Sequence, residues 1–394
     1  MELIIRTENE LNFNWFKKGI SSDYNFTFEK IPNPGDPKFL NLPEKLKNIL
    51  RLDKPDLIIS KKSNNIERPI LSIEITKSKP ASQHIEQRIP RIIAAAESDV
   101  CSIYICPKKI DGYTYKFNPK HYDLLNKISS INKIPSVFFH YSNSNDILLD
   151  EDGFPGLPKL LHPNMVEMFD LIKDYINHDQ NFENHDYKVF DCQSWKIKFE
   201  KQKNDTEGKI YKIEDLPTCK LINTSQLKNY LEGYQDLNIN WINKTVENLP
   251  SRISSREKTL ILQPETKSSR LFAHAADPYV GMLGSFDYAF CRVGRNVEER
   301  KINLVFMPLN SEDAQIKKVM GPKGYQKYYD VNCPFKSSEL ENYQSQFKIS
   351  HHLQYGCTYT KNKPLRIYGY FCDMMIFKDG VLILNVFHGD QILV

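Results

Sequence analysis

The sequence predicts an α/β domain in the first half of the chain and a mixed, β-rich α+β domain in the second half. Up to about residue 176, apolar runs of strand length alternate with segments of helical periodicity, a pattern typical of α/β folds. The polar stretch 177–188 is nearly free of aliphatic residues and separates this region from the rest. A chain of 394 residues is also too long for one typical hydrophobic core. We therefore predict two domains, residues 1–180 and 181–394.

The first domain contains four strand candidates and two helix candidates. The strands are expected at residues 25–31, 56–60, 69–76 and 100–107. A helix is expected over residues 83–98, where isoleucines fall on one face at helical spacing. Within it, Pro90 either kinks the helix or begins a second helical piece. A further amphipathic helix is expected over residues 162–176, with Pro163 in its first turn.

The second domain is richer in strand candidates. One helix is expected near residues 225–234. The strands are expected at residues 258–263, 301–307, 366–377 and 381–387. The last two flank the sequence Lys-Asp-Gly at 378–380, which favours a tight hairpin turn.

The composition is that of a soluble globular protein, with 40% hydrophobic and 26% charged residues. No apolar run approaches the roughly 20 residues that span a bilayer, and the first residues lack the basic and small-residue features of a secretory signal. The eight cysteines are scattered singly, without the paired spacing of a zinc site. We therefore expect a cytoplasmic protein with reduced thiols. The net charge of +4 permits a polyanionic partner without requiring one.

Two carboxylates are placed to meet in the first domain. Asp56 begins one short apolar strand and Glu74 lies near the end of the next, with a polar turn between the strands. Antiparallel pairing of these strands would set the two side chains opposite each other. Carboxylate oxygens suit Mg²⁺, and phosphodiester hydrolysis needs such a hard cation. The alternative is that Asp56 only begins a strand and Glu74 is an edge carboxylate without a chemical role.

The order of these features resembles the restriction-endonuclease-like PD-(D/E)xK phosphodiesterase superfamily. The matching features are Pro55-Asp56, then Glu74 after 18 positions, then the helix 83–98 and the strand "CSIYIC". The resemblance implies a mixed sheet flanked by helices. It also implies that Asp56 and Glu74 bind Mg²⁺.

The resemblance covers about the first 110 residues and implies two further contributions to this site. The backbone carbonyl of Ile75 would supply another oxygen to the metal. Glu29 occupies the place where some members of the superfamily carry an additional carboxylate.

Thr76 stands where the familiar version of this motif carries a lysine. Some restriction enzymes of the superfamily have Glu-x-Thr at this place, with glutamine and arginine on the following helix. The resemblance therefore implies that another side chain steadies the phosphate. The candidates are Lys77, Lys79, Gln83, Gln87 and Arg91, of which we favour Lys77 and Gln87 as catalytic residues. Arg91 is also a candidate for contact with the nucleic acid.

The most distinctive stretch of the second domain is residues 277–306. It contains Arg292, Arg295 and Arg300, which we predict to contact nucleic-acid phosphates. The alternative is that these arginines pair with neighbouring glutamates.

These observations predict a Mg²⁺-dependent DNA endonuclease that acts on double-stranded DNA, with catalysis in the first domain and recognition in the second. The resemblance makes a type II restriction enzyme the leading hypothesis, with a cognate DNA methyltransferase acting on the same site. Cleavage of both strands would favour a homodimer. One alternative is a nuclease-derived binding module that has lost catalysis. Another is an antiphage defence nuclease with little sequence preference.

Overall fold

The computed structural model divides the chain into two compact units, Met1–Tyr211 (unit 1) and Lys212–Val394 (unit 2). The structure describes residues 2–20, 24–33, 36–76, 86–107, 120–141, 154, 156–178, 191–205, 212–216, 218–237, 246–247, 249–264, 278–296, 299–311, 350–354, 368, 370–378 and 380–385. The division falls later than the predicted boundary at residue 180, because helix α8 (Gln193–Asn204) belongs to unit 1. Its Trp195 is buried in the unit 1 core.

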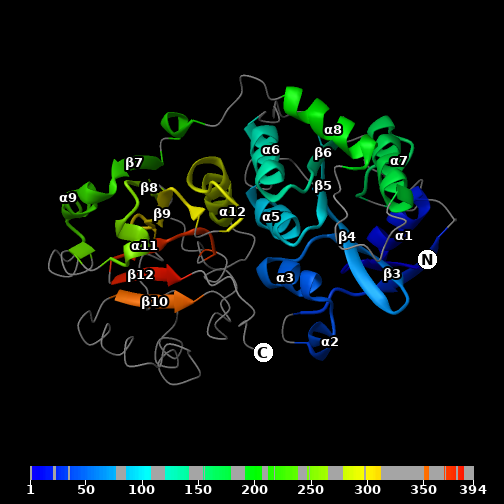
Figure 1. Ribbon diagram of the computed structural model, residues 1–394, viewed down its shortest axis with the longest axis horizontal. Helices are drawn as coiled ribbons and strands as arrows, with labels where there is room; N and C mark the ends of the chain where they lie inside the picture. The colour runs from blue at the N-terminus through cyan, green and yellow to red at the C-terminus, as the bar shows by residue number, and fades with distance from the viewer. Residues whose placement is uncertain are drawn as a thin grey trace. The chain divides into compact units, whose positions relative to one another are not determined.

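Unit 1 contains a six-stranded mixed sheet in the order β2-β1-β3-β4-β5-β6 (Figure 1). The strands are β1 (Glu2–Arg6), β2 (Asn25–Glu29), β3 (Leu57–Ser63), β4 (Ile66–Ile75), β5 (Cys101–Pro107) and β6 (Ser136–Tyr141). Strand β3 pairs antiparallel with both β1 and β4, while β4, β5 and β6 run parallel. The predicted α/β class and the four predicted strands of this domain are confirmed, and β1 and β6 are additional strands.

Helices cover both faces of this sheet. They are α1 (Glu10–Ile20), α2 (Pro37–Leu40), α3 (Glu44–Leu52), α5 (Ile89–Glu97), α6 (Lys120–Asn132), α7 (Pro163–His178) and α8. Figure 1 shows α3, α5 and α6 on one face, and α1 and α7 on the other. The main core lies on the α1 and α7 side, where Trp15 and Phe16 pack against Phe169. Gly19 of α1 lies so close to the Phe169 ring that a Cβ atom there would clash with it.

Two local features determine where the strands β3 and β4 turn and where helix α5 begins, next to Asp56 and Glu74. Asn64 and Asn65 both have positive φ values, 50° and 62°, as the two-residue turn between β3 and β4 requires. Helix α5 begins at Ile89, with Pro90 in its first turn. Pro90 therefore marks the start of a helical piece and does not kink a longer helix. Proline is tolerated at this position because the backbone N–H that it lacks would have no partner in the first turn of a helix. The predicted helix at 162–176 is confirmed as α7.

Unit 2 contains a second six-stranded mixed sheet, in the order β10-β12-β11-β9-β8-β7. The strands are β7 (Cys219–Asn223), β8 (Lys258–Leu262), β9 (Ile302–Phe306), β10 (Ser350–Gln354), β11 (Met374–Phe377) and β12 (Gly380–Asn385). The predicted hairpin is confirmed, since β11 and β12 pair antiparallel with Phe377 opposite Gly380. The strand predicted at 366–377 is shorter than expected, because Tyr368, Tyr370 and Phe371 are helical.

The helical segments of unit 2 are short. They are η3 (Ile213–Asp215), η4 (Thr224–Gln226), α9 (Leu227–Glu232), α11 (Ser251–Ser254), α12 (Pro278–Phe286) and the π-helix η5 (Asp287–Cys291). Leu231 of α9 and Ile253 of α11 pack on one face of the sheet with Ile261 and Val305. None of the helices in the described ranges is long and apolar enough to cross a bilayer. The six cysteines within these ranges are free thiols.

Candidate active site

Asp56 and Glu74 meet where β3 begins and β4 ends. The pairing of Leu57 with Ile73 sets the two carboxylates beside each other. The backbone N–H of Asp56 donates to Glu74 Oε1 at 3.1 Å, and the N–H of Ile75 donates to Asp56 Oδ2 at 2.8 Å. Each carboxylate is therefore held through one oxygen by the backbone of the neighbouring strand. The other oxygens, Asp56 Oδ1 and Glu74 Oε2, are not bound by the strand backbones and face the arginines of α5.

Arg91 of α5 lies between these two oxygens. Its NH1 donates to Glu74 Oε2 at 2.9 Å and lies 3.9 Å from Asp56 Oδ1. Its Nε donates to Asp53 Oδ2 at 2.8 Å. Asp53 is the residue that ends α3, so the guanidinium joins helix α5, helix α3 and both strands of the hairpin. Sequence reasoning placed Arg91 near the nucleic acid and did not identify Asp53.

A second arginine, Arg88, approaches the same oxygen of Glu74. Its Nε lies 3.6 Å from Glu74 Oε2 and is buried, and it has no hydrogen-bond partner among the residues that the structure describes. The side chains of Asp53 and Glu74 are each only 2% exposed, whereas that of Asp56 is 26% exposed. These carboxylates and arginines therefore form a largely buried charge cluster, in which Asp56 is the carboxylate most exposed to solvent.

Burial raises the pKa of Glu74 to about 8. Arg91 acts in the opposite direction by favouring the carboxylate, and the negative charge of Asp56 adds to the increase. Taking a carboxylate out of water without full compensation disfavours its charged form. The pKa of Glu74 therefore lies above its ordinary value, and a further cation at the site would favour its ionised form.

The pKa of Glu74 predicts how stability depends on pH. The folded pKa of about 8 exceeds the ordinary value of 4.5, so the folded state binds the additional proton and unfolding becomes easier as pH rises between these values. We expect Glu74→Gln to remove this pH dependence. In wild type, the free energy of unfolding is expected to fall by at most about 5 kcal/mol over this pH range because of Glu74. Urea unfolding of both proteins at several pH values between the two pKa limits measures the difference. Glu44→Gln, at an exposed position of α3, is the control, and equal pH slopes for wild type and Glu74→Gln would contradict the assignment.

The donor set fits a hard divalent cation in its chemistry. Asp56 Oδ1 and Glu74 Oε2 accept no backbone hydrogen bond from the described residues, and both face the position of Arg91 NH1. Mg²⁺ commonly takes one or two carboxylates and completes its shell with water and substrate oxygens. In the parts of the chain that the structure covers, no three acidic, histidine or cysteine residues form a group that could hold a metal ion. Any metal held here would therefore rely on two carboxylates, with the predicted carbonyl of Ile75 and non-protein oxygens completing its shell.

Thr76 is fixed in place of the expected lysine. Its hydroxyl lies 2.8 Å from the Tyr104 hydroxyl, and its carbonyl accepts a hydrogen bond from Tyr141 at 2.7 Å. This neutral, buried side chain cannot supply a positive charge. Lys77, Lys79 and Gln83 lie outside the described residues, and Gln87 is half-buried in the turn before α5. Arg88 and Arg91 are therefore the described cations closest to the carboxylates.

Glu29 lies apart from the carboxylate pair. It belongs to β2, which is separated from β4 by β1 and β3, a distance of roughly 14 Å at the usual strand spacing. Its carboxylate binds Arg6 at 2.5 Å, and Arg6 also binds Glu67. Glu29 thus belongs to a separate ion-pair group with Arg6 and Glu67.

Two of the three arginines predicted to contact nucleic acid lie inside unit 2. Arg300 Nε donates to Asp287 Oδ1 at 2.7 Å, and Arg292 Nε donates to Asp287 Oδ2 at 3.0 Å. Each arginine is 4% exposed, so its guanidinium is not available to a phosphate in this structure. Asp287 pairs with both arginines, and Arg300 also pairs with Asp373. Arg295 is exposed.

Asp373 extends this buried charge cluster. Its Oδ1 accepts from Arg256 at 2.8 Å, and lies 3.3 Å from both Arg252 and Arg300. Its Oδ2 accepts from the backbone N–H of Leu304 at 2.9 Å. Burial alone would raise the pKa of Asp373, but the three arginines outweigh it and hold the pKa below its ordinary value. Sequence reasoning missed this cluster because its members lie up to 121 positions apart.

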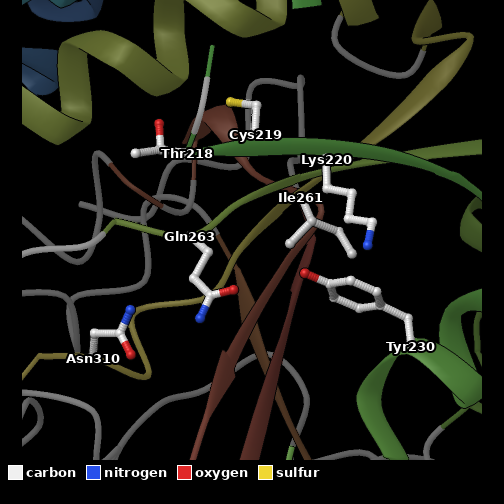
Figure 2. A pocket seen from close by; sticks show the side chains of 7 residues that line it. All are labelled: Thr218, Cys219, Lys220, Tyr230, Ile261, Gln263 and Asn310. Carbon is white, nitrogen blue, oxygen red and sulfur yellow. The ribbon is translucent and has the colours of Figure 1, made fainter. Parts of the chain in front are cut away.

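Unit 2 also contains a pocket of about 260 Å³ beside the edge strand β7 (Figure 2). It is lined by Thr218, Cys219, Lys220, Tyr230, Ile261, Gln263 and Asn310. Lys220 extends over the Tyr230 ring, with Nζ 5.1 Å from the ring centre. Tyr234 donates to Gln263 Oε1 at 2.6 Å, which fixes the amide and leaves its nitrogen as a donor. Burial raises the pKa of Cys219 to about 12, so this thiol is protonated at neutral pH.

The comparisons with known proteins add no relative. No family model matches the chain, and neither a curated protein nor a solved structure matches it significantly.

Proposed function

We propose that this protein is a Mg²⁺-dependent DNA endonuclease whose catalytic site is the Asp56–Glu74 pair of unit 1. The observation that carries the proposal is the geometry of this pair. Each carboxylate is held through one oxygen by the neighbouring strand, and the two remaining oxygens converge on one cation position. The chain order of β3, β4, α5 and β5 supports a restriction-endonuclease-like core, as the sequence resemblance implies.

Asp56 and Glu74 would hold the Mg²⁺ ion, which supplies charge neutralisation and makes hydroxide available near neutral pH. Arg88 and Arg91 would bind the oxygens of the scissile phosphate, because their guanidinium groups already converge on Glu74. Arginine presents several fixed donors to a phosphate, so it can replace the electrostatic contribution of the absent lysine. The exposed side of Asp56 gives the substrate its approach to the site.

The size of the protein favours a type II restriction enzyme within this class. A nuclease core needs only part of unit 1, and unit 2 offers a separate surface for reading DNA. Two copies of the chain would place one site on each strand of a duplex, and a cognate DNA methyltransferase would protect the same sequence.

The direct test is incubation of the purified protein with unmethylated double-stranded DNA, with Mg²⁺ and with a chelator. Fragments that form only with Mg²⁺ are expected. Sequencing of the cut ends then separates two classes of nuclease: a fixed site indicates a restriction enzyme, and scattered ends indicate a defence nuclease with little sequence preference. Binding of DNA without any cleavage would replace the proposal with a nuclease-derived binding module, which the neutral Thr76 favours.

The pocket of unit 2 is the part of this unit that best suits contact with DNA. Lys220 offers a positive charge, Tyr230 an aromatic face, and Gln263 and Asn310 amide groups, which are the side-chain types that bind phosphates and base edges. Unlike Arg292 and Arg300, Lys220 makes no ion pair with the described residues. We therefore propose that unit 2 binds DNA through this region.

Replacing Lys220 by alanine is expected to weaken DNA binding. It should also reduce the slope of log affinity against log salt concentration by about 1, the value for one lost phosphate contact. Fluorescence anisotropy across a series of salt concentrations measures this slope, with Asp56→Asn in the background to prevent cleavage. Lys378→Ala removes the same charge from a lysine that is already paired with Asp236, and serves as the matched control. Equal slopes for the two variants would exclude Lys220 from the interface.

A further inference from the structure

We infer that the Arg91 guanidinium is a resident cation of the carboxylate site, and that it must leave this position when a divalent cation binds. Metal loading would then release Arg91 to the phosphate of the substrate. This inference rests on the proposed function, because it concerns the same pair of carboxylates.

Arg91 NH1 lies at the position on which the two carboxylates converge. It is a donor to Glu74 Oε2 at 2.9 Å and lies 3.9 Å from Asp56 Oδ1. These are the two oxygens that the strand backbones leave available, so a metal ion bound by both would occupy the same space. Two cations at one such position repel each other, and this repulsion is strong in a buried site. Occupation by Arg91 and by a metal ion therefore exclude each other.

Arg91 would keep one anchor after its release from Glu74. Its Nε is bound to Asp53, whose side chain is 2% exposed and belongs to the end of α3. A rotation of the guanidinium about this contact moves NH1 away from Glu74 without losing the ion pair to Asp53. Asp53 is thus a positioning residue that keeps the released group within the site.

The released guanidinium would face the exposed side of the site. Asp56 is the most exposed of the three carboxylates, so solvent and substrate approach from its side. A guanidinium displaced from Glu74 but still held by Asp53 would meet a phosphate arriving there. Because the position must first be vacated, the apparent metal affinity equals the intrinsic affinity multiplied by the fraction of molecules in which Arg91 has left it.

The test measures metal binding without DNA, so its result does not depend on cleavage. Isothermal titration with Mg²⁺, and electron paramagnetic resonance with Mn²⁺, are applied to wild type and to Arg91→Gln. The titrations of all variants are run in the same buffer at one fixed pH, so that the difference between them reports the substitution alone. We expect Arg91→Gln to bind the metal about tenfold more tightly than wild type or better.

Arg88→Gln is the matched control, because it removes the same charge from a side chain 3.6 Å from the same oxygen of Glu74. A similar gain in both variants would show a general effect of charge and would overturn the exchange. A wild type that binds metal, with Arg91→Gln binding equally or more weakly, also overturns the exchange and leaves the proposed function standing. Absence of binding in wild type and in Arg91→Gln removes the metal site itself, and with it both proposals.

A second measurement covers the case in which Arg91→Gln does not fold. In wild-type protein labelled with ¹⁵N, the Nε–H resonance of Arg91 reports its contacts directly. Addition of Mg²⁺ is expected to shift this resonance in proportion to metal occupancy, while Asp56→Asn should abolish the shift. An Arg91 resonance that stays unchanged when the wild-type site is saturated with metal would contradict the exchange.

Discussion

Asp56→Asn is expected to lower Mg²⁺-dependent DNA cleavage by on the order of 10³-fold or more. Asparagine has nearly the shape of aspartate, and its amide oxygen can still accept the hydrogen bond from the N–H of Ile75. The substitution therefore keeps the local backbone arrangement while it removes the charge and one oxygen that would bind the metal. The initial rate of plasmid cleavage at saturating Mg²⁺ measures the loss.

A matched control separates this effect from a general loss of charge. Asp170→Asn makes the same chemical change at an exposed position of α7, where the carboxylate pairs only weakly with Lys173. We expect this variant to cleave at the wild-type rate. Both variants should retain the wild-type circular dichroism spectrum and thermal midpoint within a few degrees. Cleavage by Asp56→Asn at the rate of Asp170→Asn would remove Asp56 from the site.

Asp373→Ala is expected to destabilise unit 2 by about 3–5 kcal/mol, the usual cost of leaving a buried charge without its partner. The carboxylate is 1% exposed and neutralises guanidinium groups from Arg252, Arg256 and Arg300. It also accepts the N–H of Leu304, and so ties the segment before β11 to strand β9. Alanine removes all of these contacts at once.

Hydrogen exchange resolved by peptide measures this loss in unit 2 separately from unit 1. Asp373→Asn should be about 1 kcal/mol more stable than Asp373→Ala, because its amide oxygen can still accept the hydrogen bond from the N–H of Leu304. Asp236→Ala removes an exposed carboxylate that pairs with Lys378, and should change stability by less than about 0.5 kcal/mol. The pKa of Asp373 lies below its ordinary value, so its contribution to stability is present at neutral pH. This contribution is lost as pH falls below the ordinary value and through the lower pKa of the folded state. A stability of Asp373→Ala equal to that of Asp236→Ala would contradict the assignment.

Much of the fold could be predicted from local patterns. The apolar runs that became β2, β3, β4 and β5 are bounded by polar or turn residues, and each carries its signal within a few positions. The end of unit 1 could not be predicted in this way. The polar stretch 177–188 resembles a linker, but Trp195 of α8 returns to the core beyond it. A domain boundary depends on such long-range packing, which the composition of a segment does not contain.

In the candidate site, too, local contacts could be predicted from sequence and long-range contacts could not. Asp56 and Glu74 could be brought together from sequence, because a short hairpin leaves few possible pairings. The contact of Arg91 with Asp53 could not, because it depends on how α5 packs beside the end of α3. Arginines in a basic stretch also give the same sequence signal whether they face solvent or a buried aspartate. Arg292 and Arg300 were therefore assigned to DNA, whereas the structure pairs them with Asp287.

The charge cluster of unit 2 has a consequence for the order in which the protein folds during synthesis. Arg252 precedes Asp373 by 121 positions, which a ribosome takes on the order of ten seconds to make. For the later part of this time the three arginines and β9 have been made, while Asp373 and β11 have not. Unit 1 is already complete at this stage and is free to fold alone. The nascent chain would therefore expose an unpaired edge of β9 until β11 is made, and an unpaired strand edge favours aggregation.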